Sequence, residues 1–166
     1  MARPPVIGIM GPGIGARPGD LDNAYRLARL IARAGWTLLT GGRNEGVMAA
    51  AHKGCAEEGG FSIGILPGKT AADAAPGMTV PIVTGLGSAR NNVNVLTSNV
   101  IVACGAGLGT VSEIALALKA EKPVVLLACG PETHALFNKL APHWAQPVDT
   151  PEQAFEAVRY KLAGMG

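Results

Sequence analysis

The chain has 166 residues, of which 48% are hydrophobic and 16% are charged, and its formal net charge is +2. This length is typical of one domain and is large enough to bury a core, and the hydrophobic content excludes a disordered chain. The small net charge and the aromatic content of 4% argue against a nucleic-acid-binding surface. We therefore expect a single folded domain over residues 1–166.

The cysteines and histidines indicate a reducing compartment and no metal centre. Cys55, Cys104 and Cys129 are odd in number and form no C-x-x-C motif, which predicts buried free thiols. The three histidines do not have the spacing of metal ligands. The N-terminal apolar run is too short for a signal peptide, and no stretch reaches the ~18 apolar residues of a membrane span. We expect a cytoplasmic protein without a membrane segment.

Five short runs are apolar at both odd and even positions, which is typical of parallel strands buried on both faces. These runs are residues 6–10, 36–40, 62–66, 100–104 and 124–128. A sixth and weaker run, 79–83, contains Pro81, which favours an edge strand or no strand at all because proline cannot donate a ladder hydrogen bond.

Apolar residues at helical spacing alternate with these runs. Helices are expected over 20–34, 46–58, 88–98, 110–120 and from Thr150-Pro151 onward. Asp20 and Thr150 are the expected N-caps of the first and last helices. The alternation predicts a doubly wound, Rossmann-like α/β fold, with a mostly parallel sheet and helices on both faces.

Glycine is in excess, with 23 residues in clusters that follow the expected strands. Ligands of doubly wound sheets bind beyond the carboxyl ends of the strands, so the glycines predict a binding site at that edge. The irregular stretch 67–87 fits either a lid over this site or a surface connection, and the sequence leaves both open.

Two glycine-rich segments resemble nucleotide-binding motifs without completing them. Gly11–Ala16 fits G-x-G-x-x-A, but the first helix is expected only near Asp20, and the second strand ends in Thr40-Gly41-Gly42 without a ribose-binding acid. Gly68-Lys69-Thr70 lacks the first glycine of a P-loop. The sequence therefore disfavours a dinucleotide site and a nucleoside triphosphatase.

The strand over residues 100–104 leads through the glycine-rich turn 105–109 to the start of a helix. Free N–H groups and the helix dipole at such a start bind anions, and the Thr110 hydroxyl adds a donor. Thr110-x-x-Glu113 is also the pattern of a capping box, in which both side chains serve only the helix. Both interpretations stay open on sequence alone.

Three segments together resemble the LOG-like family of the SLOG nucleotide-binding superfamily, whose members often carry the label "possible lysine decarboxylase". The segments are residues 40–48, Ala89-Arg90 and the turn 105–113. The family turn, P-G-G-x-G-T-x-x-E, is matched at Gly107, Gly109, Thr110 and Glu113. Gly105 stands for its proline and Ala106 for its first glycine. Arg90 precedes Gly105 by the same 15 residues that separate the family's arginine from its proline.

The resemblance implies two candidate functions. In LOG enzymes an arginine and the glutamate of the turn, here Arg90 and Glu113, assist hydrolysis of the N-glycosidic bond of a nucleoside 5′-monophosphate. Molybdenum cofactor carrier proteins, a second branch, bind a phosphorylated pterin without chemistry. Asn91, where LOG enzymes have lysine, and the altered start of the turn make the chain more similar to the carrier branch. No pyridoxal phosphate motif is visible, so we expect no lysine decarboxylase.

We therefore expect a binding or carrier protein for a phosphorylated small molecule, either a molybdopterin-type cofactor or a nucleoside monophosphate such as AMP. The alternative is a phosphoribohydrolase with Arg90 and Glu113 as catalytic residues. No further cofactor, nucleic acid or membrane partner is expected, and the low charge and the resemblance imply a homodimer or homotetramer. The expected ligand-binding residues are Gly13, Gly41, Gly42, Met48, Arg90, Asn91, Gly105, Gly107, Gly109 and Thr110.

Overall fold

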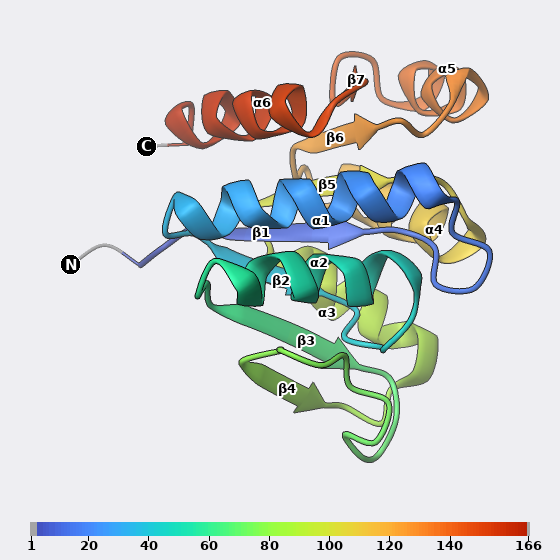
Figure 1. Ribbon diagram of the computed structural model, residues 1–166. Coiled ribbons are helices and arrows are strands. Elements are labelled where there is room, and N and C mark those ends of the chain that lie inside the picture. The colour runs from blue at the N-terminus through green and yellow to red at the C-terminus, as the bar shows by residue number, and fades with distance from the viewer. Residues whose placement is uncertain (1–2, 166) are drawn as a thin grey trace.

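The computed structural model describes residues 3–165 and contains a seven-stranded sheet whose strands all run parallel. The strand order is β4-β3-β2-β1-β5-β6-β7, as can be followed in Figure 1. The doubly wound α/β fold is therefore confirmed, with a sheet that is fully rather than mostly parallel. The strands are β1 (Val6–Met10), β2 (Thr37–Thr40), β3 (Ser62–Leu66), β4 (Val80–Val83), β5 (Val100–Cys104), β6 (Val124–Leu127) and β7 (Ala145–Val148).

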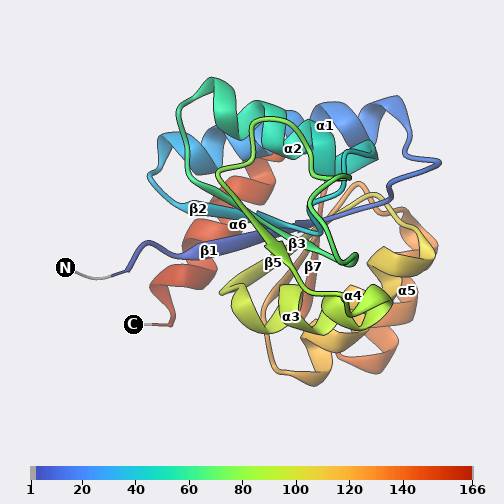
Figure 2. The same cartoon turned by 90° about the horizontal axis from the view of Figure 1, so that it is seen from below.

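Three helices cover each face of the sheet (Figure 2). One face carries α1 (Pro18–Arg33), α2 (Gly46–Glu57) and α6 (Pro151–Ala163). The other carries α3 (Arg90–Thr97), α4 (Leu108–Lys119) and α5 (Pro131–Leu140), with a short 3₁₀ turn before α3. Within residues 3–165, every helix is too short or too polar to cross a membrane.

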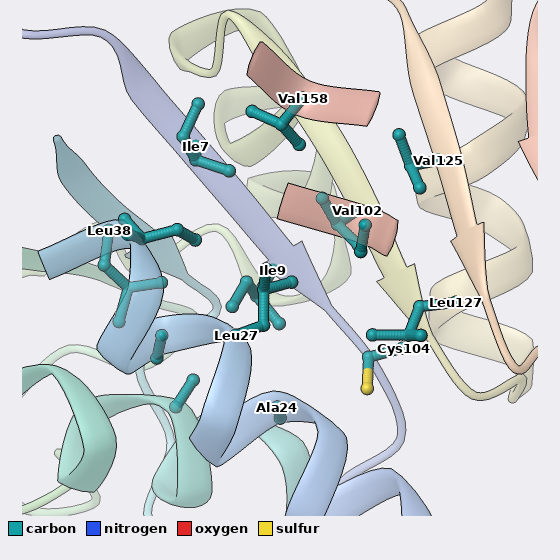
Figure 3. Packing of buried hydrophobic residues seen from close by; sticks show 14 of the residues in the cluster. Ile7, Ile9, Ala24, Leu27, Leu38, Val102, Cys104, Val125, Leu127 and Val158 are labelled. Atoms are coloured by element: carbon teal, nitrogen blue, oxygen red, sulfur yellow. The ribbon is translucent and has the colours of Figure 1, made fainter. Parts of the chain in front are cut away.

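The two helical layers divide the core because side chains alternate across each strand. In β5, Val102 and Cys104 pack toward α1 and α6, and Figure 3 shows them beside Ile9 and Leu127. Ile101 and Ala103 point to the opposite face, toward α4 and α5. All five β5 residues are buried, as the apolar residues at both parities predict.

The β4 strand lies at one edge of the sheet, as Pro81 predicts, and all its residues are exposed. The stretch that leads to it is tied to the loop after β2, because the amide of Ala75 donates to the Gly42 carbonyl (2.9 Å) and the amide of Asn44 donates to the Asp73 carbonyl (2.7 Å). Of residues 67–87, only Pro67 and Gly87 line the main pocket. The structure thus favours a surface connection over a lid.

Of the two helix caps predicted from the sequence, one is wrong and one is confirmed. The first helix begins at Pro18, and Asp20 is its third residue, where the carboxylate accepts from the backbone N–H of Arg17 (3.0 Å). The predicted Asp20 cap is therefore wrong. The helix can begin at Pro18 because amides in the first helical turn have no partner within the helix, so the missing N–H of proline costs no hydrogen bond. The predicted cap at Thr150 is confirmed, with Gln153 as its partner.

The elements α5 and β7 were not predicted from the sequence. The α5 helix buries only Phe137 among its residues, so its apolar periodicity is weak. The β7 strand contains Pro147 and lies at the second edge of the sheet. Proline has no N–H to donate to a neighbouring strand, and an edge strand tolerates this because one of its sides is unpaired. Edge elements bury little apolar surface and consequently leave little pattern in the sequence.

Helices α1 and α2 approach each other closely at Gly54, where an added Cβ would collide with the backbone carbonyl of Tyr25. We expect Gly54→Ala to lower the free energy of unfolding by about 1–3 kcal/mol, because overpacking outweighs the gain in helix propensity. Gly19→Ala, in α1, is the matched control, since an added Cβ there meets nothing within 4 Å. Denaturant unfolding checks the pair, and equal stability of the two variants would contradict the prediction.

Candidate ligand-binding site

The main pocket opens at the carboxyl ends of β1, β2 and β5 and has a volume of about 440 Å³. Strands β2 to β4 lie on one side of β1, and strands β5 to β7 lie on its other side, with β1 and β5 adjacent. The pocket therefore lies at the topological switch point, where the strand order reverses. Nine residues singled out from the sequence line it: Gly13, Gly41, Met48, Arg90, Asn91, Gly107, Gly109, Thr110 and Glu113.

The N-terminus of α4 faces this pocket without a side-chain cap. Gly107 is the N-cap residue. The first amide that donates to a carbonyl of this turn is that of Val111, which bonds to the Gly107 carbonyl (2.8 Å). The Thr110 hydroxyl is buried and has no hydrogen-bond partner among the described residues. The capping-box interpretation of Thr110 and Glu113 is therefore wrong, because the helix begins two residues earlier than predicted. Free amides and an unpaired hydroxyl together suit an anion.

The N-terminus of α1 differs, because a carboxylate already occupies it. Asp20 is 2% exposed and pairs with the Arg17 guanidinium (2.8 Å) as well as with the Arg17 amide. A pyrophosphate at this end would meet that negative charge. A carboxylate at this helix N-terminus agrees with the sequence analysis, which disfavours a dinucleotide site at the G-x-G-x-x-A segment.

Arg90 lies on the floor of the pocket with only 8% of its surface exposed. Its guanidinium rests against Gly41, where any side chain would overlap it, and its Nη1 donates to Asn91 Oδ1 (3.1 Å). The Nε group is buried and has no hydrogen-bond partner in the part of the chain that the structure describes. Burial lowers the pKa of Arg90, and Glu113 partly offsets this. Arginine nevertheless stays charged in proteins, so the pocket contains a cation with unused donors.

Glu113 lies beside Arg90, with Oε1 4.0 Å from Arg90 Nη1. The same oxygen accepts a hydrogen bond from Asn94 Nδ2 (2.8 Å). Burial raises the pKa of Glu113 to about 7, although Asn94 and Arg90 both favour the charged form. Near neutral pH the carboxyl is therefore protonated in a large fraction of molecules and compensates the charge of Arg90 only in part.

The pocket lining also includes an ion pair between Arg43 and Glu45 (2.8 Å). Glu45 packs against Gly13, where an added Cβ would lie 2.8 Å from Glu45 Oε2. Met48 also approaches this glycine. The pocket lining therefore combines N–H donors at α4 and Arg90 with a paired charge at Arg43 and Glu45 and with apolar surface at Met48.

Gly42 and Gly105 do not line the pocket, although the sequence placed both in the site. Both have positive φ angles, of 79° and 76°, which glycine adopts without strain. An added Cβ on Gly42 would contact Gly64 and Leu66, and one on Gly105 would contact Asp20. These glycines shape the turns that the other site residues use.

The sequence analysis missed Asn94, Arg43 and Glu45. Asn94 follows Arg90 by four residues on one helix, so a shared helical face could have identified it. Arg43 and Glu45 follow β2 at the edge where ligands bind, which was the available signal for both. Within the described part of the chain, no group of His, Cys, Asp and Glu side chains is placed to hold a metal ion.

The fold and the pocket define a Rossmann-like α/β protein with a polar cleft at its topological switch point. The chain belongs to the SLOG cluster4 family, whose model matches residues 4–155. The resemblance to the SLOG superfamily and its carrier branch is thereby confirmed.

Three proteins are similar to this chain over most or a large part of its length. A molybdenum cofactor binding protein from the phototrophic bacterium Rippkaea orientalis is 49% identical, with a TM-score of 0.96 over 98% of this chain and 99% of its own. The Moco carrier protein of Chlamydomonas reinhardtii is 48% identical, with a TM-score of 0.92 over 98% and 99%. An uncharacterized protein of Archaeoglobus fulgidus is 43% identical over 106 residues, which are 63% of this chain and 68% of that one.

The raised pKa of Glu113 makes stability depend on pH. Between its ordinary pKa of 4.5 and about 7, the folded chain holds more protons at Glu113 than the unfolded chain. Stability is therefore lost as the pH rises through this window, by about 3 kcal/mol in total at 1.36 kcal/mol per pKa unit. Glu113→Gln keeps an acceptor for Asn94 and lacks this loss. We expect it to gain about 3 kcal/mol relative to the wild type from pH 4 to pH 8.

Chemical denaturation at several pH values measures this difference. His52, whose pKa burial lowers to about 4, titrates in the opposite sense in both proteins, so its contribution cancels. A stability difference that stays constant across the pH range would contradict the raised pKa of Glu113.

Proposed function

We propose that this chain binds and carries a molybdopterin-type cofactor, a phosphorylated pterin, in the pocket at the switch point. The observation that carries the proposal is similarity over nearly the whole chain to a molybdenum cofactor binding protein and to a Moco carrier protein, at 49% and 48% identity. The pocket supports it independently, because its lining includes Arg90 and Thr110, whose buried Nε and hydroxyl have no partner among the described residues.

In this proposal the ligand's phosphate lies at the N-terminus of α4. The amides of Gly109 and Leu108 and the Thr110 hydroxyl donate to it, and no acidic residue stands in the first turn to oppose it. Arg90 donates to the same phosphate or to a second anionic group, and its buried Nε gains a partner. Gly13, Gly41 and Met48 form the wall along the rest of the ligand. A nucleoside monophosphate such as AMP presents the same phosphate chemistry.

A phosphoribohydrolase is the second candidate, and the pKa of Glu113 favours it. A buried carboxyl with a pKa of about 7 beside an arginine is suited to acid–base chemistry. Against it stands Asn91, which occupies the position of the LOG lysine and bonds to Ser112 Oγ (3.0 Å). The pocket then lacks one cation that the enzyme pattern supplies, and we therefore prefer the carrier function.

A homodimer or homotetramer and a cytoplasmic location stay predictions. Exposed apolar side chains, Leu96 on α3 and Leu108 at the start of α4, offer surface that a second copy could bury.

Loss of the Arg90 side chain should weaken ligand binding about ten- to a hundredfold, because one charge-assisted hydrogen bond is worth roughly 1.5–3 kcal/mol. Native mass spectrometry and titration calorimetry with the molybdenum cofactor, AMP and inorganic phosphate measure this for Arg90→Ala. Arg159→Ala is the matched control, since Arg159 is exposed on α6 and, among residues 3–165, pairs only with Glu156. A wild-type chain that binds none of the three probes would refute the proposed function.

The wild-type chain should release no adenine from AMP, and Glu113→Gln should bind AMP about as well as the wild type does. Chromatography of the products tests both statements. Wild-type turnover above about 0.1 per second, near the low end of enzyme rates, that disappears in Glu113→Gln would instead establish the hydrolase.

A further inference from the structure

His52 lies on α2 outside the pocket, is fully buried and is the centre of a chain of hydrogen bonds between polar side chains. Its Nε2 lies 2.8 Å from the Thr40 hydroxyl and its Nδ1 lies 3.1 Å from the Ser62 hydroxyl. Thr40 and Ser62 are also fully buried, at the end of β2 and the start of β3. Burying three polar groups in a core costs free energy unless each is hydrogen-bonded, and here each of the three side chains has a partner.

The chain of hydrogen bonds ends at the backbone of the pocket. The Thr40 hydroxyl accepts from the amide of Gly42 (2.9 Å), which fixes the turn that follows β2. Gly42 takes a φ of 79° in this turn. Gly41, the residue before it, lies directly against the Arg90 guanidinium and leaves no room for a side chain. The position of Gly41 therefore determines where the guanidinium can lie.

Arg90 has few other restraints. Its Nε has no partner among the described residues, its one hydrogen bond goes to the neighbouring Asn91, and Glu113 is 4.0 Å away. A long side chain held by so few bonds depends on the surfaces packed against it. The surface supplied by Gly41 is held rigid by Thr40 and His52.

We infer that Thr40 and His52 are positioning residues that hold Arg90 in the orientation required to bind the ligand's anion. They act through Gly42 and Gly41 and do not touch the ligand. This inference rests on the proposed function in assigning the anion to Arg90, but the orientation of Arg90 itself can be measured without any ligand.

Thr40→Val and Thr40→Ser form the matched pair that tests the inference. Valine keeps the shape and removes the hydroxyl that serves Gly42 and His52, whereas serine keeps the hydroxyl and loses a methyl group. In NMR spectra of the ligand-free protein, we expect the Arg90 Nε–Hε signal to shift and to exchange faster in Thr40→Val and to stay as in the wild type in Thr40→Ser. Arg90→Lys, which lacks this group, assigns the signal.

Binding provides the second measurement, with AMP and inorganic phosphate as probes. We expect Thr40→Val to weaken binding about fivefold and Thr40→Ser to leave it nearly unchanged. In an Arg90→Ala background, Thr40→Val should add no further loss, because its effect acts through Arg90. A substitution that merely destabilised the fold would not show this dependence. Val158→Ala, a core change in α6, is the control for a general loss of stability.

Each outcome decides between the alternatives. An unchanged Arg90 signal in Thr40→Val, equal effects of valine and serine, or a further loss of binding without Arg90 would overturn the inference. If the wild-type chain binds neither probe, the nucleotide and phosphate part of the proposed function fails, and the NMR comparison alone decides the positioning role. If Thr40→Val does not fold, Ser62→Ala, which removes the other partner of His52, takes its place, and a wild-type Arg90 signal there overturns the inference.

Discussion

The parallel pairing of β1 with β5 is the constraint on which the rest of the molecule depends. Their register, from Ile7 with Val100 to Met10 with Ala103, brings the loop after β1 beside the turn after β5. Gly11 allows this approach, because a side chain there would collide with Val47 and the Cys104 carbonyl. The pocket exists because the two halves of the sheet separate at this pair.

The loop after β1 also contacts two helix N-termini that differ in charge. The Pro12 side chain packs near Gly107 at the start of α4, while Gly13 packs near Glu45 at the start of α2. The α2 end carries a carboxylate paired with Arg43, and the α4 end carries free amides and the unpaired Thr110 hydroxyl. The free amides and the positive dipole end at the start of α4 favour an anionic group, which agrees with the position proposed for the ligand's phosphate.

Two groups of buried polar side chains differ in whether their donors and acceptors have hydrogen-bond partners. In the chain formed by Thr40, His52 and Ser62, each side chain has hydrogen-bond partners, which makes this region rigid. In the pocket, Arg90 Nε and the Thr110 hydroxyl have no hydrogen-bond partners within residues 3–165. Unpaired donors in a buried site are costly for a fold alone, and a bound anion removes that cost. The satisfied group thus supports the unsatisfied one.

The sequence by itself determined the elements whose pattern is strong. Central strands such as β5 are apolar at both parities because both faces are covered, and the glycines at 105–109 mark a strand-to-helix turn. Pocket residues such as Gly13, Gly41 and Gly107 could therefore be found in advance, since they follow the carboxyl ends of these strands. Arg90 and Asn91 were identified through the family resemblance instead. The edge strand β7 and the helix α5 could not, because they bury too little apolar surface to leave a periodic pattern.

The tertiary structure alone decided the chemistry of Glu113. As a sequence motif, Thr110 and Glu113 fitted a capping box equally well. Only the packing of α3 against α4 shows that Asn94 takes the Glu113 carboxyl, that Arg90 lies beside it and that burial raises its pKa. Contacts between residues distant in the sequence depend on how crossovers place helices, and no local pattern records that placement. For the same reason, the link from His52 to Arg90 was invisible until the fold was known.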